Sequence, residues 1–129
     1  MISETHTAQD IQISVATHYL QEQSDPDRNL YAFSYTIGIE NHSEQPVRLL
    51  SRHWVITDDN NRVEEVRGPG VVGEQPRLAP GEAFVYTSYC PLNTQVGRMH
   101  GSYQMTTDEG ELFDVRIAPF TLTLPHALN

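Results

Sequence analysis

The stretch LLSRHWVITDDNNRVEEVRGPGVVGEQP, residues 49–76, predicts a strand, a hairpin turn, a second strand and a glycine-rich loop, with no helix signal between them. The turn is predicted at 58–61, DDNN, because Asp and Asn tolerate positive φ. The first strand, expected over 47–57, has bulky apolar side chains on both faces, so we expect it to be central or half covered by a partner. The second, over 62–67, is short and charged.

The sequence on either side of this stretch alternates between apolar and polar residues. Residues 11–20 and 31–39 alternate over their whole length, which is the period of a half-buried strand. Further strands are expected over 83–89, 98–106, 112–117 and 120–124, the last two separated near Pro119. Seven or eight short strands without an amphipathic helix predict an all-β fold, an antiparallel β-sandwich.

Two aromatic positions favour the immunoglobulin-like form of this sandwich. Trp54, the only Trp, lies on the third predicted strand, where immunoglobulin domains bury one. Tyr103 lies two residues before Met105, as the corner tyrosine of those domains precedes the second cysteine. We therefore expect Trp54 and Tyr103 to anchor the two facing sheets.

Length and composition indicate one soluble domain. The chain has 129 residues, and we assign 1–10 to a flexible N-terminus, 11–124 to a single domain and 125–129 to a C-terminal tail. The first ten residues lack a secretory signal, and no apolar stretch approaches the ~18 residues of a membrane span. The single cysteine, Cys90, fits a reducing compartment. A cytoplasmic protein without membrane contact is expected.

The charge is large, negative and uneven. The net charge is −9, and all eight cations are Arg. Residues 48–77 contain five Arg and five acids, whereas the remainder has three Arg and twelve acids. Such a chain repels phosphate backbones, which argues against unspecific nucleic-acid binding. An anion or an acidic partner would meet least repulsion at the central stretch.

Five segments together resemble the bacterial ApaG family: LLSRHW (49–54), GPGVVGEQP (68–76), LAPGE (78–82), TSYCPL (87–92) and GRMHGSYQM (97–105). The resemblance extends from Tyr19 to Leu124 and implies a small sandwich like immunoglobulin and fibronectin type III domains. Related eukaryotic domains, in an F-box protein and a DNA-polymerase-delta-interacting protein, look like protein-binding modules. The bacterial family is linked to cobalt resistance and magnesium efflux. The genes that neighbour its own suggest a nucleotide as a ligand. Two positions depart from the family pattern: the family usually has Gly where this chain has Asn61, and many members have Gly where it has Tyr89.

The run Gly68–Gly73 matches the dinucleotide fingerprint G-x-G-x-x-G in its letters. That fingerprint needs a helix behind the third glycine, whose N-terminal N–H groups hold the pyrophosphate. Here Glu74, Gln75 and Pro76 follow, so a tight inter-strand loop is favoured. A pyrophosphate held by loop N–H groups, with Arg52 and Arg67, remains an alternative.

Catalytic and metal-binding patterns are weak. Ser51 and His53 share one strand face, but no nucleophile elbow or positioned acid accompanies them, so structural roles are favoured. The six His show no metal-ligand spacing, and a site built in space from His53, Glu64 and His100 stays open. Cys90 is interpreted as a small, partly buried side chain. We predict no catalytic residue, metal or cofactor.

The sequence thus favours a non-enzymatic binding module for an unidentified protein partner. Aromatic residues beside Arg are typical of interface hot spots, and an open sheet edge could also bind a partner or form a homodimer. The alternative is a small-ligand protein that binds a nucleotide pyrophosphate, with or without a divalent cation, at the glycine-rich loop. The candidate binding residues are Arg52, His53, Arg67, Gly68, Gly70, Val71, Val72, Gly73 and Glu74.

Overall fold

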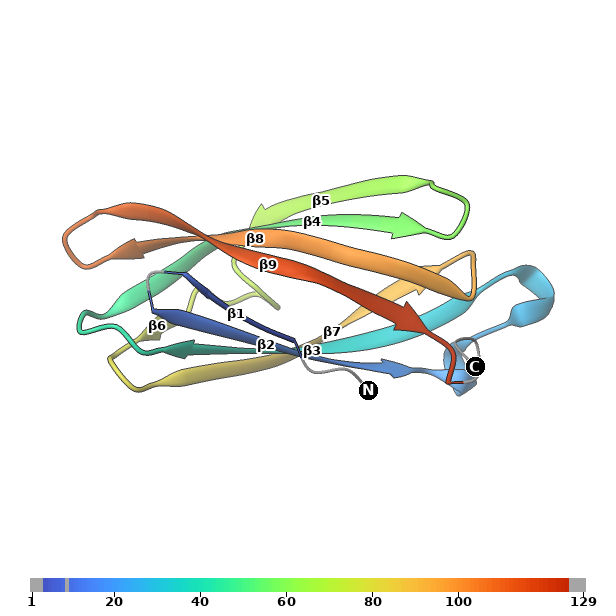
Figure 1. Ribbon diagram of the computed structural model, residues 1–129, viewed down its shortest axis with the longest axis horizontal. Helices are drawn as coiled ribbons and strands as arrows, with labels where there is room; N and C mark the ends of the chain where they lie inside the picture. The colour runs from blue at the N-terminus through green and yellow to red at the C-terminus, as the bar shows by residue number, and fades with distance from the viewer. Residues whose placement is uncertain (1–3, 9, 126–129) are drawn as a thin grey trace.

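The computed structural model describes residues 4–8 and 10–125, which form nine strands and two short 3-10 turns (Figure 1). The strands are β1 (Glu4–Ala8), β2 (Ile11–Tyr19), β3 (Tyr31–Asn41), β4 (Val47–Asp58), β5 (Val63–Pro69), β6 (Arg77–Leu78), β7 (Ala83–Leu92), β8 (Val96–Thr107) and β9 (Leu112–Thr123). The turns η1 (Gln21–Gln23) and η2 (Pro26–Arg28) lie between β2 and β3. Among the described residues no helix is long and apolar enough to cross a membrane.

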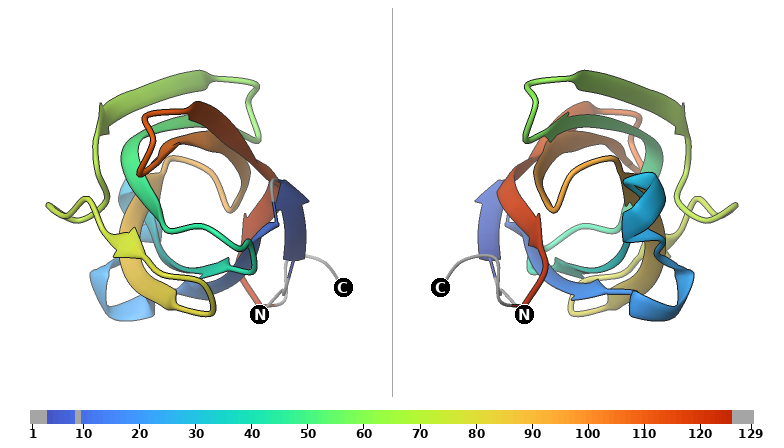
Figure 2. Two further views of the ribbon diagram at one scale, coloured as in Figure 1. Left: turned by 90° about the vertical axis from the view of Figure 1, so that its left-hand side faces the viewer. Right: turned by 90° about the vertical axis from the view of Figure 1, so that its right-hand side faces the viewer.

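The strands form two antiparallel sheets that pack face to face. One sheet has the order β1-β2-β3-β7, and the other has the order β5-β4-β8-β9, with β6 also paired to β4. Viewed end on, β1 and β9 lie on one side of the sandwich and β5 and β7 on the other (Figure 2). The predicted all-β antiparallel sandwich is confirmed.

The core lies between the two sheets and follows the predicted alternation. Every second residue of β2 and β3 points inward, and the fully buried ones include Ile11, Ile13, Phe33, Ile37 and Ile39. Burial of such side chains contributes roughly 1.5–3 kcal/mol each. Trp54 is also buried, and its ring stands edge-on to Tyr35 at 5.4 Å and to Tyr103 at 6.2 Å between centroids. Trp54 therefore joins the sheets, as predicted.

Tyr103 also joins the sheets, but not in the manner of a corner tyrosine. In immunoglobulin domains the corner hydroxyl bonds to main chain a few residues upstream. Here the hydroxyls of Tyr103 on β8 and Tyr86 on β7 lie 2.5 Å apart, so the bond crosses the core. Burial raises the pKa of both tyrosines, which keeps them neutral. Tyr103 also lies well inside β8 (Val96–Thr107) and not near the start of the strand, so the expected likeness to a corner tyrosine is wrong.

The apolar residues on both faces of β4 result from a β-bulge and not from coverage on two sides. Between Leu49 and Ser51 the register against β8 shifts by one residue. Leu49 and Trp54 consequently both face the core, although their spacing would place them on opposite faces of a regular strand. Of the two expectations for this strand, the central position is confirmed, since β4 lies between β5 and β8, and no partner is needed to explain the pattern.

The strand count and boundaries also differ from the prediction. The structure adds β1, within residues 1–10, and the two-residue β6. The segments 112–117 and 120–124 form one strand, β9, that runs through Pro119. Proline is tolerated there because β9 is an edge strand and the register against β8 shifts beside it, between Met99 and Gly101. Residues 126–129 of the predicted tail lie outside the described residues.

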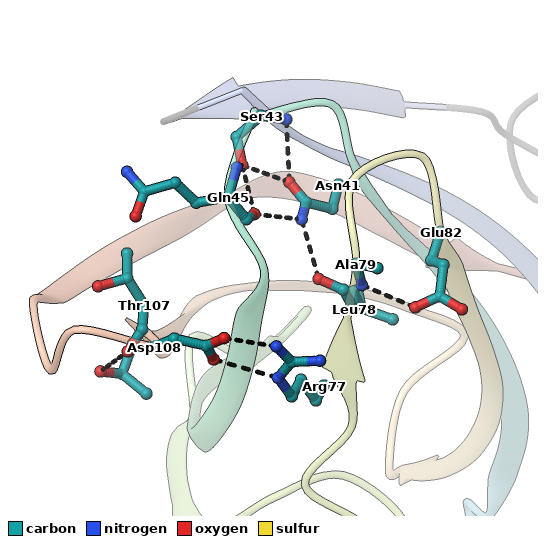
Figure 3. A network of polar contacts seen from close by, with 10 residues as sticks. Asn41, Ser43, Gln45, Arg77, Leu78, Ala79, Glu82, Thr107 and Asp108 are labelled. Carbon is teal, nitrogen blue, oxygen red and sulfur yellow. Dashed lines mark hydrogen bonds and ion pairs between the residues drawn. The ribbon is translucent and has the colours of Figure 1, made fainter.

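A polar network fixes the connection between the sheets. We call residues 70–78, from the end of β5 through β6, the strap. Arg77 forms an ion pair with Asp108 in the β8–β9 turn. The buried Asn41 donates through its side-chain amide to the carbonyl of Leu78 at 3.0 Å and to that of Gln45 at 2.8 Å (Figure 3). The strap is thereby tied to both sheets at its far end.

Candidate functional site

Four of the nine predicted binding residues, Arg52, His53, Arg67 and Gly68, line one shallow depression, and the other five lie in the strap. Arg52 lies on the inner face of β4 beneath the strap, whereas His53 and Arg67 lie on the outer face of the five-stranded sheet. The strap and the end of β5 supply Gly68, Gly70, Val71, Val72, Gly73 and Glu74.

Arg52 acts as a bracket for the strap. Its guanidinium donates to the carbonyl oxygens of Pro69 at 2.9 Å and Gly70 at 3.0 Å. It lies directly across Gly68, where a Cβ would stand 2.9 Å from its nitrogens. Gly68 therefore leaves room for the guanidinium. Arg52 is committed to main-chain carbonyls, which is a structural use of its charge.

The tip of the strap is a closed turn. Val71 and Glu74 exchange two main-chain hydrogen bonds, of 2.8 and 2.9 Å. The two residues between them, Val72 and Gly73, have φ of 43° and 81°, the left-handed conformation of a two-residue hairpin turn. Val71 is fully buried and joins the core, whereas Val72 is 53% exposed. Only one of the two valines needs outside cover.

Three main-chain donors of the strap are already bonded to carbonyls of the protein. The N–H of Gly70 donates to the carbonyl of Leu50 at 2.8 Å, and the N–H groups of Val71 and Glu74 bond to each other's carbonyls. Residues 74–76 lead into β6, so no helix follows Gly73. The geometry that a phosphate nest requires, several free N–H groups with one target, is therefore not supplied by these three groups.

The outer face of the five-stranded sheet brings together polar residues from four strands. In one cross-strand row, Arg67, His53, Ser102 and Arg116 are neighbours on β5, β4, β8 and β9. His53 Nε2 lies 2.7 Å from Glu65 Oε1, and Arg67 lies 3.6 Å from the same oxygen. A shallow depression here is lined by residues of all four strands: Ser51, Arg52, His53, Arg67, Gly68, Pro69, Ser102, Gln104 and Asp114. Sequence reasoning found the β4 and β5 residues and missed those from β8 and β9.

The metal and thiol alternatives receive no support from the geometry. Glu64 lies on the opposite face of β5 from Glu65, so it does not join His53. Within residues 10–125 no three His, Cys, Asp or Glu side chains are grouped to hold a metal ion. Cys90 is buried, and burial followed by the nearby Glu64 carboxylate raises the pKa of its thiol to about 12. Such a thiol is a poor nucleophile at neutral pH.

A further surface, the free edge of β7, was not among the predicted sites. β7 ends its sheet, with β3 as its only strand neighbour in the described part of the chain. Its ten residues, AFVYTSYCPL, contain no charge. On its outer face Val85 is 64% exposed and Tyr89 is 51% exposed. The alternation of Val85, Thr87 and Tyr89 was visible in the sequence, but the strand order that makes β7 an edge was not.

The main-chain groups that β7 leaves unpaired can be assigned from its neighbour. The N–H of Asn41 donates to the carbonyl of Glu82 at 2.9 Å, so Asn41 directs its main chain toward β7. Main-chain groups of successive strand residues point to opposite sides, so every second residue of β3 does the same. Their partners on β7 are Phe84, Tyr86, Ser88 and Cys90. The intervening residues direct their N–H and C=O groups to the free edge: Val85, Thr87 and Tyr89.

Comparison with known proteins identifies the family. The model of the ApaG domain matches residues 21–107. The chain belongs to the ApaG domain family. "Protein ApaG" of Ectopseudomonas mendocina is 56% identical over 92% of this chain and 94% of its own length, and that of Caulobacter vibrioides is 58% identical over 92% and 84%. A crystal structure of a Bordetella pertussis protein described as ApaA is 51% identical and superposes with a TM-score of 0.89, covering 92% of this chain and 96% of the other.

The match to the ApaG domain covers most of the features described above. Residues 21–107 include the Arg52 bracket, the strap, His53 with Glu65, and all of β7. β9, with Asp114 and Arg116, lies beyond the matched range. The sequence resemblance to the ApaG family is thus confirmed.

Proposed function

We propose that this ApaG domain is a non-enzymatic module that binds a protein partner by adding an extended segment of that partner to β7. The observation that carries the proposal is a ten-residue edge strand without a charge, in a chain of net charge −9. Proteins ordinarily protect such edges with charged residues, because the unpaired main chain is a template for another strand.

The side chains beside the edge support the same role. Val85 and Tyr89 are two positions of one outward face, separated by Thr87, and both are more than half exposed. In strand addition, main-chain hydrogen bonds supply affinity and alternate side chains supply specificity. Tyr is also enriched in interface hot spots. An extended segment with apolar residues at every second position would match this face.

The polar outer face of the other sheet does not favour catalysis over binding. His53 is held by Glu65 at 2.7 Å, and its neighbours across the strands are Arg67 and Ser102. A serine hydrolase requires a base aligned with its nucleophile and an oxyanion hole. In the strap, the N–H groups of Gly70, Val71 and Glu74 donate to carbonyls of the strap and β4, so these three are not free to form such a hole.

Selection from a random peptide library tests the proposal without knowledge of the partner. We expect selected peptides to shift the amide NMR signals of Val85, Thr87 and Tyr89 more than those of β5. Val85→Lys should abolish peptide binding. Val63→Lys on β5, where the valine is 61% exposed, is the matched control and should bind normally. Failure to select peptides, or binding that survives Val85→Lys, would overturn the proposal.

A further inference from the structure

The outward residues of β7 have an order that is self-complementary. They are Ala83, Val85, Thr87, Tyr89 and Pro91. If two copies of β7 run antiparallel with Thr87 opposite Thr87, each Val85 lies opposite a Tyr89 of the other copy. Aromatic and β-branched residues are among the favourable cross-strand pairs. The order therefore suits a second copy of the same strand.

The main chain suits the same register. Val85, Thr87 and Tyr89 direct their N–H and C=O groups to the free edge, as the bonds of Asn41 imply. In an antiparallel ladder, residues that face each other in this way exchange two hydrogen bonds. Three such pairs give about six main-chain hydrogen bonds. Pro91, which has no N–H, falls at the end of the ladder opposite Ala83, where one missing donor matters least.

We propose that β7 binds β7 of a second copy of this chain in this register, so that the two four-stranded sheets become one continuous sheet. The inference rests on the proposed function, since it uses the same edge and names one occupant. The proposed dimer requires no contact between the two copies outside β7.

Two copies of this chain repel each other because both are strongly negative, but β7 itself has no charged residue. Each chain carries a net charge of −9, and β7 is a long uncharged edge on its surface. The pair would meet without juxtaposing like charges within the ladder itself. Repulsion between the rest of the two chains acts over a Debye length of about 8–10 Å and is screened by salt. Dimerisation should therefore strengthen as the salt concentration rises.

Sedimentation equilibrium of the full chain, from about 10 µM to about 1 mM, tests the dimer, because an edge contact of this size gives a weak complex. We expect a concentration-dependent dimer that is strengthened in 0.5 M NaCl. Val85→Lys should be monomeric over the whole range, while Val63→Lys, of matched exposure, should dimerise like the unaltered chain. A monomer at about 1 mM, or a dimer that persists in Val85→Lys, would overturn the inference.

Disulfide trapping tests the register. In a Cys90→Ala background, a mixture of Val85→Cys and Tyr89→Cys chains should cross-link readily, since these positions are opposite. Val85→Cys alone should not, because its two copies would lie four residues apart along the ladder, about 13 Å. Cross-linking of Val85→Cys with itself at the rate of the mixture would overturn the register.

The outcome separates this inference from the proposed function. If the chain stays monomeric while selected peptides still bind β7, the β7–β7 dimer is ruled out and strand addition by a partner is retained. If the chain is monomeric and binds no peptide, both the dimer and the proposed function are ruled out. A dimer that selected peptides dissociate, with loss of the Val85–Tyr89 cross-link, supports both.

Discussion

Strands β5 and β7 are the two edges on one side of the sandwich, and they are built in opposite ways. β5 has Glu64, Glu65 and Arg67 and is exposed or half-exposed along its whole length. β7 has no charge, and alternate residues such as Tyr86 and Cys90 are buried. β5 is joined to β4 by seven register pairs and by side-chain contacts of Arg52 and His53. β7 is held by the core.

The difference shows how an edge strand can be stable and still available for binding. Charged side chains such as those on β5 usually protect an edge strand from pairing with another chain. β7 needs no such contacts because its inner side chains anchor it, and its outer face and free edge are left for other uses. Each of the following changes affects one side of this comparison, in order of decreasing expected effect.

The inner anchor of β7 should matter most. Tyr86→Ala removes a buried ring and leaves the Tyr103 hydroxyl without its partner, so we expect a loss of about 3–5 kcal/mol in the free energy of unfolding. The equivalent change on β5, Val66→Ala, truncates a half-buried side chain and should cost about 1 kcal/mol. Urea unfolding of both variants measures the difference. Equal losses would show that β5 is also held by the core.

The Arg52 bracket should matter next. Arg52→Ala removes two hydrogen bonds from a charged donor to the carbonyls of Pro69 and Gly70, at a cost of about 1–2 kcal/mol. Hydrogen exchange should accelerate first at the Gly70 amide. Arg67→Ala is the control: its side chain is exposed, and the loss should stay below about 0.5 kcal/mol. Unchanged exchange at Gly70 in Arg52→Ala would contradict the bracket.

The buried thiol of β7 should make stability depend on alkaline pH. Burial raises the pKa of Cys90 from 9.0 to about 12. Between these values the unfolded thiol has lost its proton and the folded thiol has not, so the unfolded state binds fewer protons. This group's contribution to stability therefore falls by about 1.4 kcal/mol per pH unit above pH 9.

Cys90→Ala isolates that contribution. The tyrosines with raised pKa values lose stability in the same direction and remain in both proteins. The difference in unfolding free energy between the unaltered chain and Cys90→Ala, measured in urea at pH 8, 10 and 11, should shrink as the pH rises. A difference that stays constant would show that the thiol ionises in the folded state near its ordinary pKa.

The outward valines should affect stability least. Val85→Lys and Val63→Lys replace side chains that are already mostly exposed, so each should change the free energy of unfolding by less than about 0.5 kcal/mol. Thermal unfolding at low protein concentration, where association is absent, measures this. A large loss in Val85→Lys alone would mean that Val85 packs within one chain, and its effect on binding would need another explanation.

The strands were predictable because their signal is local. Alternation in 11–20 and 31–39, and the Asp-Asn turn at 58–61, depend on neighbouring residues only. Asn61 has φ of 62°, as that turn requires. The errors arose where distant residues decide. At the bulge, the carbonyl of Leu50 accepts hydrogen bonds from the N–H of Gly70 and from the side-chain amide of Gln75. Gln75 lies 25 residues further along the chain, so no local pattern reveals the bulge.

The candidate site shows the same division. Sequence reasoning chose Arg52 and Arg67 because Arg beside an aromatic residue is typical of interfaces and because both could help to hold a pyrophosphate. The side-chain period of two placed Arg52 and His53 on opposite faces of β4, as the structure has them. It could not show that Arg52 would turn to the carbonyls of the strap. It also treated Val71 and Val72 alike, although one is in the core.

The sequence by itself determined that this chain forms an antiparallel β-sandwich, because short strand segments, several of them alternating, with turn residues between them leave few other ways to bury the apolar faces. It also determined the family, through motifs spread over most of the length. Tertiary structure alone decided which strands are edges. Sheet order depends on pairing between residues far apart in the chain, and that order makes β7 an open edge and β4 an interior strand.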